Sequence, residues 1–120
     1  MTEPAAFADP AAIEGWHAHI YYEAATRPVA EAVGAGIAAA FPAAVLGRWH
    51  DVPVGPHTRA MYQVAFSTDL MPAFLPWLML NRRGLAVLVH PETGHPLADH
   101  TRHTGWLGEV LPLLTEVLPA

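Results

Sequence analysis

The sequence predicts an α+β fold in which four strands and two helices follow the order βαββαβ, with a third helix at the end of the chain. Short segments that alternate between apolar and polar residues indicate the strands, and longer segments with apolar residues at helical spacing indicate the helices. A chain of 120 residues can bury one core and is too short for two. We therefore assign residues 15–120 to a single domain and residues 1–14, which are rich in alanine and proline, to a flexible N-terminal arm.

The first half of the domain is expected to form a strand, a helix and a second strand. Residues 15–22 (GWHAHIYY) alternate, with two histidines and a tyrosine on one face of the strand. A helix follows, because Thr26 can cap its N-terminus, apolar residues recur at every fourth position, and Pro42 ends it. Residues 43–51 are expected to form the second strand.

The second half is expected to repeat this order. Residues 60–66 (AMYQVAF) predict the third strand. A second helix begins at Ser67 or Thr68 and ends near Arg83, and Pro76 is expected to kink it.

The end of the domain completes the predicted topology. Residues 85–90 are expected to form the fourth strand, and residues 106–118 a final amphipathic helix. The order βαββαβ is that of the ferredoxin-like split βαβ fold, a four-stranded antiparallel sheet with the strand order 4-1-3-2 and both long helices on one face. Within it, we expect strands 1 and 3 to run parallel side by side and strand 4 to run antiparallel to strand 1.

Composition excludes several classes of function. The formal net charge is −5, with six lysines and arginines in total, so we expect no nucleic-acid partner, which would need clustered cations. Cysteine is absent, which excludes disulfides and thiolate ligands. No apolar stretch reaches the roughly 20 residues that span a bilayer, and no secretory signal is recognised at the N-terminus. We therefore expect no membrane partner and a cytoplasmic location.

Histidine is the unusual residue of this sequence, with eight copies spread over short motifs. The predicted strand order places the start of strand 1, the start of strand 3 and the end of strand 4 at one edge of the sheet. Strand alternation then directs a polar set to the face without helices, and imidazole is the commonest ligand for Fe, Zn, Cu and Ni. The expected members of this cluster are His17, His19, Tyr21, His57, Gln63 and His90.

Several neighbouring residues have two interpretations. A carboxylate ligand could come from Glu92 or Asp99, with Asp51 less favoured, and Asp99 could instead hold a ligand imidazole by its N–H group. Arg48 and Arg59 could bind a substrate carboxylate or could be solvated. The remaining histidines could cap strand 2 or form a solvated surface or a lid over the site; they are His50, His95, His100 and His103.

Four segments together resemble the DOPA 4,5-dioxygenase family over about residues 15–118. The combination of an HxHxYY strand, a GPH turn and an NRRGLxVLVHPxTG segment is specific. The segments are WHAHIYY at 16–22, VGPHTRAMYQVAF at 54–66, WLMLNRRGLAVLVHPETG at 77–94, and DHTRHTGWLGEVLPL at 99–113.

The resemblance implies a ferredoxin-like fold, self-association as a homodimer, and extradiol cleavage of a catechol such as L-DOPA by non-haem iron and O2. The motif histidines carried over by the resemblance are His17, His19, His57, His90 and His100. It leaves open which of them bind metal and which transfer protons.

Two hypotheses follow. In the first, Fe(II), or Zn or another divalent ion in the protein as purified, is held by three of the four metal candidates His17, His19, His57 and His90. His19, His57 or His100 then acts as acid and base, and Tyr21 or Gln63 orients the substrate or the oxygen species. In the second, the chain is a non-catalytic dimeric protein that binds a metal or a small molecule. The intact histidine set favours the first.

Overall fold

The structure is a computed structural model that describes residues 6–120, so the first five residues of the expected N-terminal arm lie outside the described residues. Residues 6–14 are mostly exposed and include one short 3-10 helix, η1 (Pro10–Ala12). The N–H group of Glu14 donates to the carbonyl of Glu92 at 2.8 Å. This bond attaches the arm to the sheet at the point where the first strand begins.

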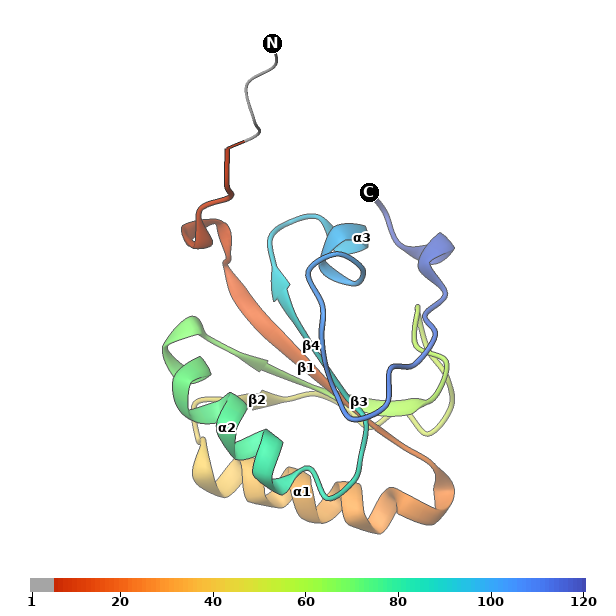
Figure 1. Cartoon of the computed structure of the whole chain (residues 1–120). Helices are drawn as coiled ribbons and strands as arrows, with labels where there is room; N and C mark the ends of the chain where they lie inside the picture. The colour runs from red at the N-terminus through yellow and green to blue at the C-terminus, as the bar shows by residue number, and fades with distance from the viewer. Residues whose placement is uncertain (1–5) are drawn as a thin grey trace.

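The described chain forms one five-stranded antiparallel sheet in the order β2-β3-β1-β4-β5 (Figure 1). The first four strands have the predicted order 4-1-3-2, and the fifth was not predicted. The strands are β1 (Gly15–Tyr22), β2 (Val45–Leu46), β3 (Ala60–Phe66), β4 (Val87–Glu92) and β5 (Gly105–Leu107).

The expectation that strands 1 and 3 run parallel is wrong, because β3 pairs antiparallel with β1. The crossover through α1 (Arg27–Ala40) makes β2 parallel to β1. The chain then turns back from β2 to an antiparallel β3, which lies between them. The start of β3 therefore lies beside the end of β1, at the opposite end from His17.

The second strand is shorter than the predicted segment 43–51, because its pairing with β3 is interrupted by a bulge. Val45 pairs with Ala65 and Leu46 with Val64, but the next bridge along joins His50 to Met61. One extra residue is therefore inserted before His50, which takes the chain out of the regular ladder.

The two long helices, α1 and α2 (Met71–Asn81), cover one face of the sheet as predicted (Figure 1). Thr26 occupies the N-cap position of α1 as expected, but its side chain makes no capping hydrogen bond to the helix. The helix α2 continues through Pro76 after a 3-10 turn, η3 (Thr68–Leu70). The strand residues that face the helices form the main core, which confirms the predicted alternation; they are Ala18, Ile20, Tyr22, Tyr62, Val64, Phe66, Val87 and Val89.

The predicted C-terminal helix over residues 106–118 is wrong. Trp106 instead pairs with Leu88 in β5, and Gly108 then turns the chain with a φ of 78°. Pro112 lies in the following extended segment, where it lacks the N–H group that a helix interior needs. Leu111 of this segment is buried against the second face of the sheet. That face is thus covered by the end of the chain (Figure 1).

Among residues 6–120, no helix is both long enough and apolar enough to cross a membrane.

Candidate metal centre

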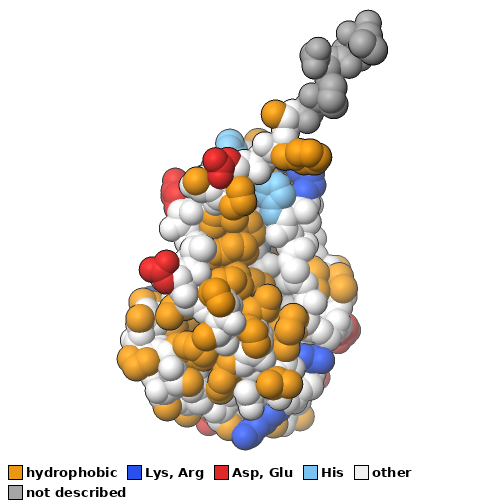
Figure 2. All heavy atoms as spheres, turned by 60° about the vertical axis from the view of Figure 1, so that its left-hand side comes forward, with side chains coloured by type: hydrophobic (Ala, Val, Ile, Leu, Met, Phe, Trp, Pro, Cys, Tyr) orange, Lys and Arg blue, Asp and Glu red, His pale blue; other side chains and the backbone are white. Residues whose placement is uncertain are grey.

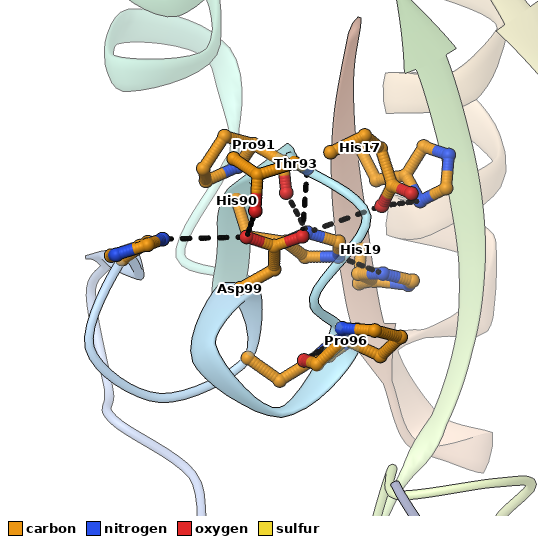
Figure 3. Close-up of polar contacts among 10 residues, drawn as sticks. His17, His19, His90, Pro91, Thr93, Pro96 and Asp99 are labelled. Carbon is orange, nitrogen blue, oxygen red and sulfur yellow. Dashed lines mark hydrogen bonds and ion pairs between the residues drawn. The ribbon is translucent and has the colours of Figure 1, made fainter. Parts of the chain in front are cut away.

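Five histidine rings meet on the face of the sheet away from α1 and α2. Figure 3 labels three of them, His17, His19 and His90. They form two overlapping groups that share His19, and within each group the candidate ligand atoms lie within 4.8 Å of one another. The first group is His17, His19 and His90, and the second is His19, His57 and His100.

The pairing of β1 with β4 builds the first group. His17 lies directly opposite His90, and His19 follows two residues later on the same face of β1. The Nε2 atoms of His19 and His90 are 3.1 Å apart. Two nitrogens bound at about 2.1 Å to one ion would be separated by roughly 3.0–3.4 Å in octahedral or tetrahedral geometry. The observed separation matches that of two adjacent ligands of a single metal ion.

Hydrogen bonds on the outer side orient two of these rings. The Nδ1 atom of His17 lies 3.1 Å from Oε1 of Glu92, and the same oxygen is 3.5 Å from Nδ1 of His90. His90 donates from Nδ1 to the carbonyl of Pro91 at 3.0 Å. A ring that donates from Nδ1 keeps the lone pair on Nε2 for a ligand, which is the usual arrangement around protein metal ions.

His57 joins the cluster by a route other than the one expected. Because β3 is antiparallel to β1, His57 lies near Tyr21 rather than near His17, and its backbone forms a bridge with Leu113. The ring still reaches inward, with its centroid 4.2 Å from that of His19. Its Nδ1 atom is 2.7 Å from the hydroxyl of Tyr21. The predicted proximity is observed, but a loop produces it rather than the strand edge.

His100 follows a short helix, α3 (Pro96–Asp99). It donates from Nδ1 to the carbonyl of Pro96 at 2.7 Å, and its ring centroid lies 4.1 Å from that of His90. His100 therefore lies beside the candidate ligands and not on a solvated surface, which was one of the two positions that the sequence allowed.

Burial favours the neutral form of four rings of the cluster, His17, His19, His57 and His90. It lowers the pKa of His57 and of His90 to about 4, and neighbouring histidines add to the effect on both. The pKa of His19 lies well below its usual value, again because of burial first and of four surrounding rings second. Burial also lowers the pKa of His17, although Glu92 opposes this. Neutral imidazole is the form that binds metal.

One buried atom of the cluster has no partner. Because Nδ1 of His90 donates to a carbonyl, its Nε2 accepts from the N–H group at Nε2 of His19. The lone pair at Nδ1 of His19 is then left without a hydrogen bond, in a residue that is 2% exposed. Buried polar groups are normally satisfied. This unpaired lone pair of His19 and the ligand-like spacing of the Nε2 atoms of His19 and His90 show that the residues fit a transition-metal ion.

The candidate carboxylates divide into one that contacts the cluster and two that do not. Glu92 contacts two rings, as described above. Asp99 is buried but accepts hydrogen bonds from the backbone and the hydroxyl of Thr93, at 2.9 and 2.6 Å, and from His103 at 3.3 Å. Asp51 is exposed and bonded by Tyr22 and Arg27, away from the site.

Of the three residues predicted to bind or orient a substrate, one lies on the same face as the rings and two lie away from them. Gln63 is half-buried and pairs across the strands with His19, so it belongs to the same face. Arg48 is exposed after β2, and Arg59 lies 3.7 Å from Glu23 and 3.6 Å from Glu109, beyond the opposite end of β1 from His17. Three histidines lie outside the five-ring cluster: His50, His95 and His103.

A shallow groove of about 470 Å³ on the side of β2 reaches His17, one member of the first group. Its polar end is formed by Glu14, His17 and Glu92, and its remaining lining is largely apolar, with Trp16, Ala43, Val45, Ala65 and Phe66. Figure 2 shows apolar side chains covering much of this side of the molecule. The groove provides access for a small, largely apolar molecule.

Sequence reasoning missed some contributors to the site. Trp106, assigned to a helix, stacks on Tyr21 with a centroid distance of 5.9 Å. The backbone carbonyls of Pro91 and Pro96 orient the rings of His90 and His100. Residue type does not predict such contacts, because every residue has a carbonyl. The sequence does indicate the contact of Glu92 with His90, because residues two apart on a strand share a face.

Comparisons with known proteins agree with this fold. The sequence profile of the Dopa 4,5-dioxygenase family matches residues 16–117. The DOPA 4,5-dioxygenase of Amanita muscaria is 32% identical over 115 residues, which is 89% of this chain and 50% of that protein. An uncharacterized 21.2 kDa protein of Botryotinia fuckeliana is 43% identical over 81 residues, or 61% of this chain and 44% of that protein. The chain thus spans about half the length of the curated relatives it matches.

A solved structure is similar over almost its whole length. The crystal structure of a candidate dioxygenase from Nostoc punctiforme aligns with a TM-score of 0.91 at 50% sequence identity. The match covers 92% of this chain and 96% of that one.

Proposed function

This chain belongs to the Dopa 4,5-dioxygenase family, and we propose that it is an extradiol ring-cleaving dioxygenase that acts on a catechol. In such a reaction the carbon–carbon bond next to the two hydroxyl groups breaks and both atoms of O2 enter the product. The observation that carries the proposal is the 3.1 Å separation of Nε2 of His19 from Nε2 of His90 in a cluster of neutral rings.

His17, His19 and His90 are the residues that would hold the metal, which we propose to be Fe(II). Three ligands on one side leave adjacent positions for a catechol and O2, and a bound redox metal would supply electron transfer between them. Glu92 supports this set by contacting both His17 and His90. The chemistry of the donor atoms suits several divalent ions, so Zn can occupy the same position in the purified protein.

His57 and His100 are the rings we propose for proton transfer. A catechol must release its hydroxyl protons, and a neutral ring can accept one and return it later. Each ring has its Nδ1 atom engaged, His57 with Tyr21 and His100 with the carbonyl of Pro96. Each therefore has Nε2 available inside the cluster. Tyr21 acts as a positioning residue that fixes the orientation of His57.

The groove beside His17 is the proposed entry for the aromatic ring. Its apolar lining suits an aromatic face, and its polar end carries His17 and Glu92. A catechol entering this way brings its hydroxyl groups toward the histidines. Gln63, beside His19, is placed to orient the bound molecule.

The direct test loads the metal-free protein with Fe(II) under anaerobic conditions and then adds oxygen and a catechol. L-DOPA, caffeate and unsubstituted catechol form the panel. We expect a yellow semialdehyde product and the consumption of one O2 per catechol cleaved. Stoichiometric iron binding without turnover of any member would leave a metal-binding protein without catalysis and refute the proposal.

Two variants sharpen this test. Tyr21→Phe keeps the ring that stacks on Trp106 and removes the hydroxyl bonded to His57. We expect kcat to fall by at least about tenfold with little change in KM or iron affinity, and the pH profile of kcat to shift. His95→Ala, at an exposed position outside the cluster, is the matched control and should leave turnover unchanged.

A further inference from the structure

Two rings of the cluster have an Nε2 atom that the proposed metal position does not use. His57 has its Nδ1 atom against the hydroxyl of Tyr21, and His100 donates from Nδ1 to a backbone carbonyl. The Nε2 atoms of both rings make no hydrogen bond with any part of residues 6–120. The Nε2 atom of His100 is therefore free to coordinate a ligand, and that of His57 is free in the tautomer that donates from Nδ1 to the Tyr21 oxygen.

The ring of His19 lies beside both, with centroid distances of 4.2 Å to His57 and 6.1 Å to His100, and it also has a free nitrogen. Its Nε2 atom faces His90, whereas its Nδ1 atom is buried and has no hydrogen-bond partner. Within residues 6–120 this is the one buried side-chain nitrogen or oxygen in that condition. Ligand atoms of His19, His57 and His100 lie within 4.8 Å of one another. Burial of an unpaired nitrogen costs free energy, and a bound cation would remove that cost.

We propose that His19, His57 and His100 form a second site for a divalent transition-metal ion, separate from the first position but sharing His19 with it. The two nitrogens of one ring would then bind two ions. This requires His19 to lose its remaining N–H proton, which passes to the solvent when the second ion binds. Three imidazoles favour Zn, Cu or Ni over Mg or Ca, which prefer oxygen ligands.

The charge of the surroundings suits a second cation. Glu92 contacts His17 and His90, and the buried carboxyl of Asp99 directly precedes His100 in the chain. The ion pairs and hydrogen bonds of the five rings within residues 6–120 involve no lysine or arginine. A second ion would therefore meet no fixed positive charge among these contacts.

The second site has a functional consequence, which rests on the proposed function. His57 and His100 are the rings assigned to proton transfer, and a metal ion on their Nε2 atoms would occupy the lone pairs that accept the proton. Fe(II) in the first position alone supports turnover. An excess of Zn(II) also fills the second site and blocks turnover. The second site is thus inhibitory.

The test counts ions in the absence of substrate. Metal-free protein is titrated with Zn(II) in a calorimeter, in two buffers that differ in their enthalpy of ionisation. We expect two ions per chain, with one more proton released in the second step than neutral ligands alone would give. His100→Ala and His57→Gln should each lose the second ion and keep the first. His95→Ala, at an exposed histidine outside the cluster, should keep both.

The outcomes separate this inference from the proposed function. One ion per chain in the wild-type protein overturns the second site, and so do two ions that survive both His100→Ala and His57→Gln. Failure to turn over any catechol contradicts the proposed function and leaves the ion count untouched. Circular dichroism melting of each metal-free variant identifies any that does not fold, and the other variant then decides the result.

Discussion

Glu92 decides how two of the candidate ligands are oriented, although it stands outside the ring cluster. One of its oxygens is 3.1 Å from Nδ1 of His17 and 3.5 Å from Nδ1 of His90. Carboxylates in this position fix the tautomer of a ligand histidine and raise its basicity, and their loss costs roughly 10–100-fold in metal affinity. Because the side chain of Glu92 is half-exposed, it can be substituted without disturbing the hydrophobic core.

Glu92→Gln should weaken metal binding by about tenfold or more while the protein stays folded, because the amide keeps the size and loses the charge. Competition titration of Zn(II) against a chelator of known affinity measures the change. Glu116→Gln, at an exposed position in the C-terminal segment, is the control for loss of one negative charge. Equal affinities for the two variants would show that Glu92 has no part in holding His17 and His90.

At the level of elements, α3 and its flanking loop depend on one buried side chain. Asp99 is 2% exposed and accepts two hydrogen bonds from Thr93 and one from His103. Burial opposes ionisation of Asp99, but these bonds together outweigh it and lower the pKa of the carboxyl. The contact ties the residue after Glu92 to the residue before His100. It therefore fixes the position of Glu92 relative to that of His100.

Asp99→Ala should destabilise the metal-free protein by about 2 kcal/mol, since hydrogen bonds to charged groups contribute roughly 1.5–3 kcal/mol and Thr93 loses its partner. Urea unfolding followed by circular dichroism gives the free energy of unfolding. Asp69→Ala, in the exposed turn before α2, is a matched control that should cost much less. A similar loss in both variants would contradict the anchoring role of Asp99.

The elements differ in how far the sequence could predict them. Alternation along residues 15–22 was sufficient to place His17, His19 and Tyr21 on one face, because a buried strand has few alternatives. The C-terminal segment was misread, since Leu and Val at helical spacing also fit an extended segment that lies on a sheet. Its conformation is set by pairing of Trp106 with Leu88, a contact between distant residues.

The site was predicted more completely than the route by which it is assembled. The five motif histidines are those that meet in the structure, but the position of His57 was inferred from a parallel pairing that does not occur. A loop brings it inward instead, and loop paths depend on packing that strand patterns do not encode. Residue patterns alone do not decide whether His100 belongs to a solvated surface or to a lid, because His95 and His103 lie in the same loop and are also histidines.

At the level of the whole molecule, the cluster is complete within the part of the chain that matches the family. All five rings lie within the matched residues 16–117, although this chain matches only 44% and 50% of the length of the two curated relatives. The expected homodimer stays a prediction. The exposed apolar side chains of the described chain include Val45 beside the groove and Leu80 on α2.

The buried rings make the stability of the whole molecule depend on pH. His57 and His90 have pKa values of about 4 in the folded protein and about 6.5 when unfolded, so between these values the unfolded chain binds more protons. The free energy of unfolding therefore falls as the pH falls through this window and is constant above it. Between pH 6.5 and 5, before most carboxyl groups titrate, the loss should be of the order of 2 kcal/mol per ring.

Urea unfolding of the metal-free protein at pH 7.5, 6.5 and 5 measures this loss. His57→Gln removes one titrating ring, so its free energy of unfolding should fall less steeply between pH 6.5 and 5 than that of the wild-type protein. Zn-loaded protein should stay stable further into the acid range, because the bound ion competes with protons for the same nitrogens. Equal slopes for the wild type and His57→Gln would mean that His57 is not held neutral by the fold. The second metal position would then lack one of the neutral rings on which it depends.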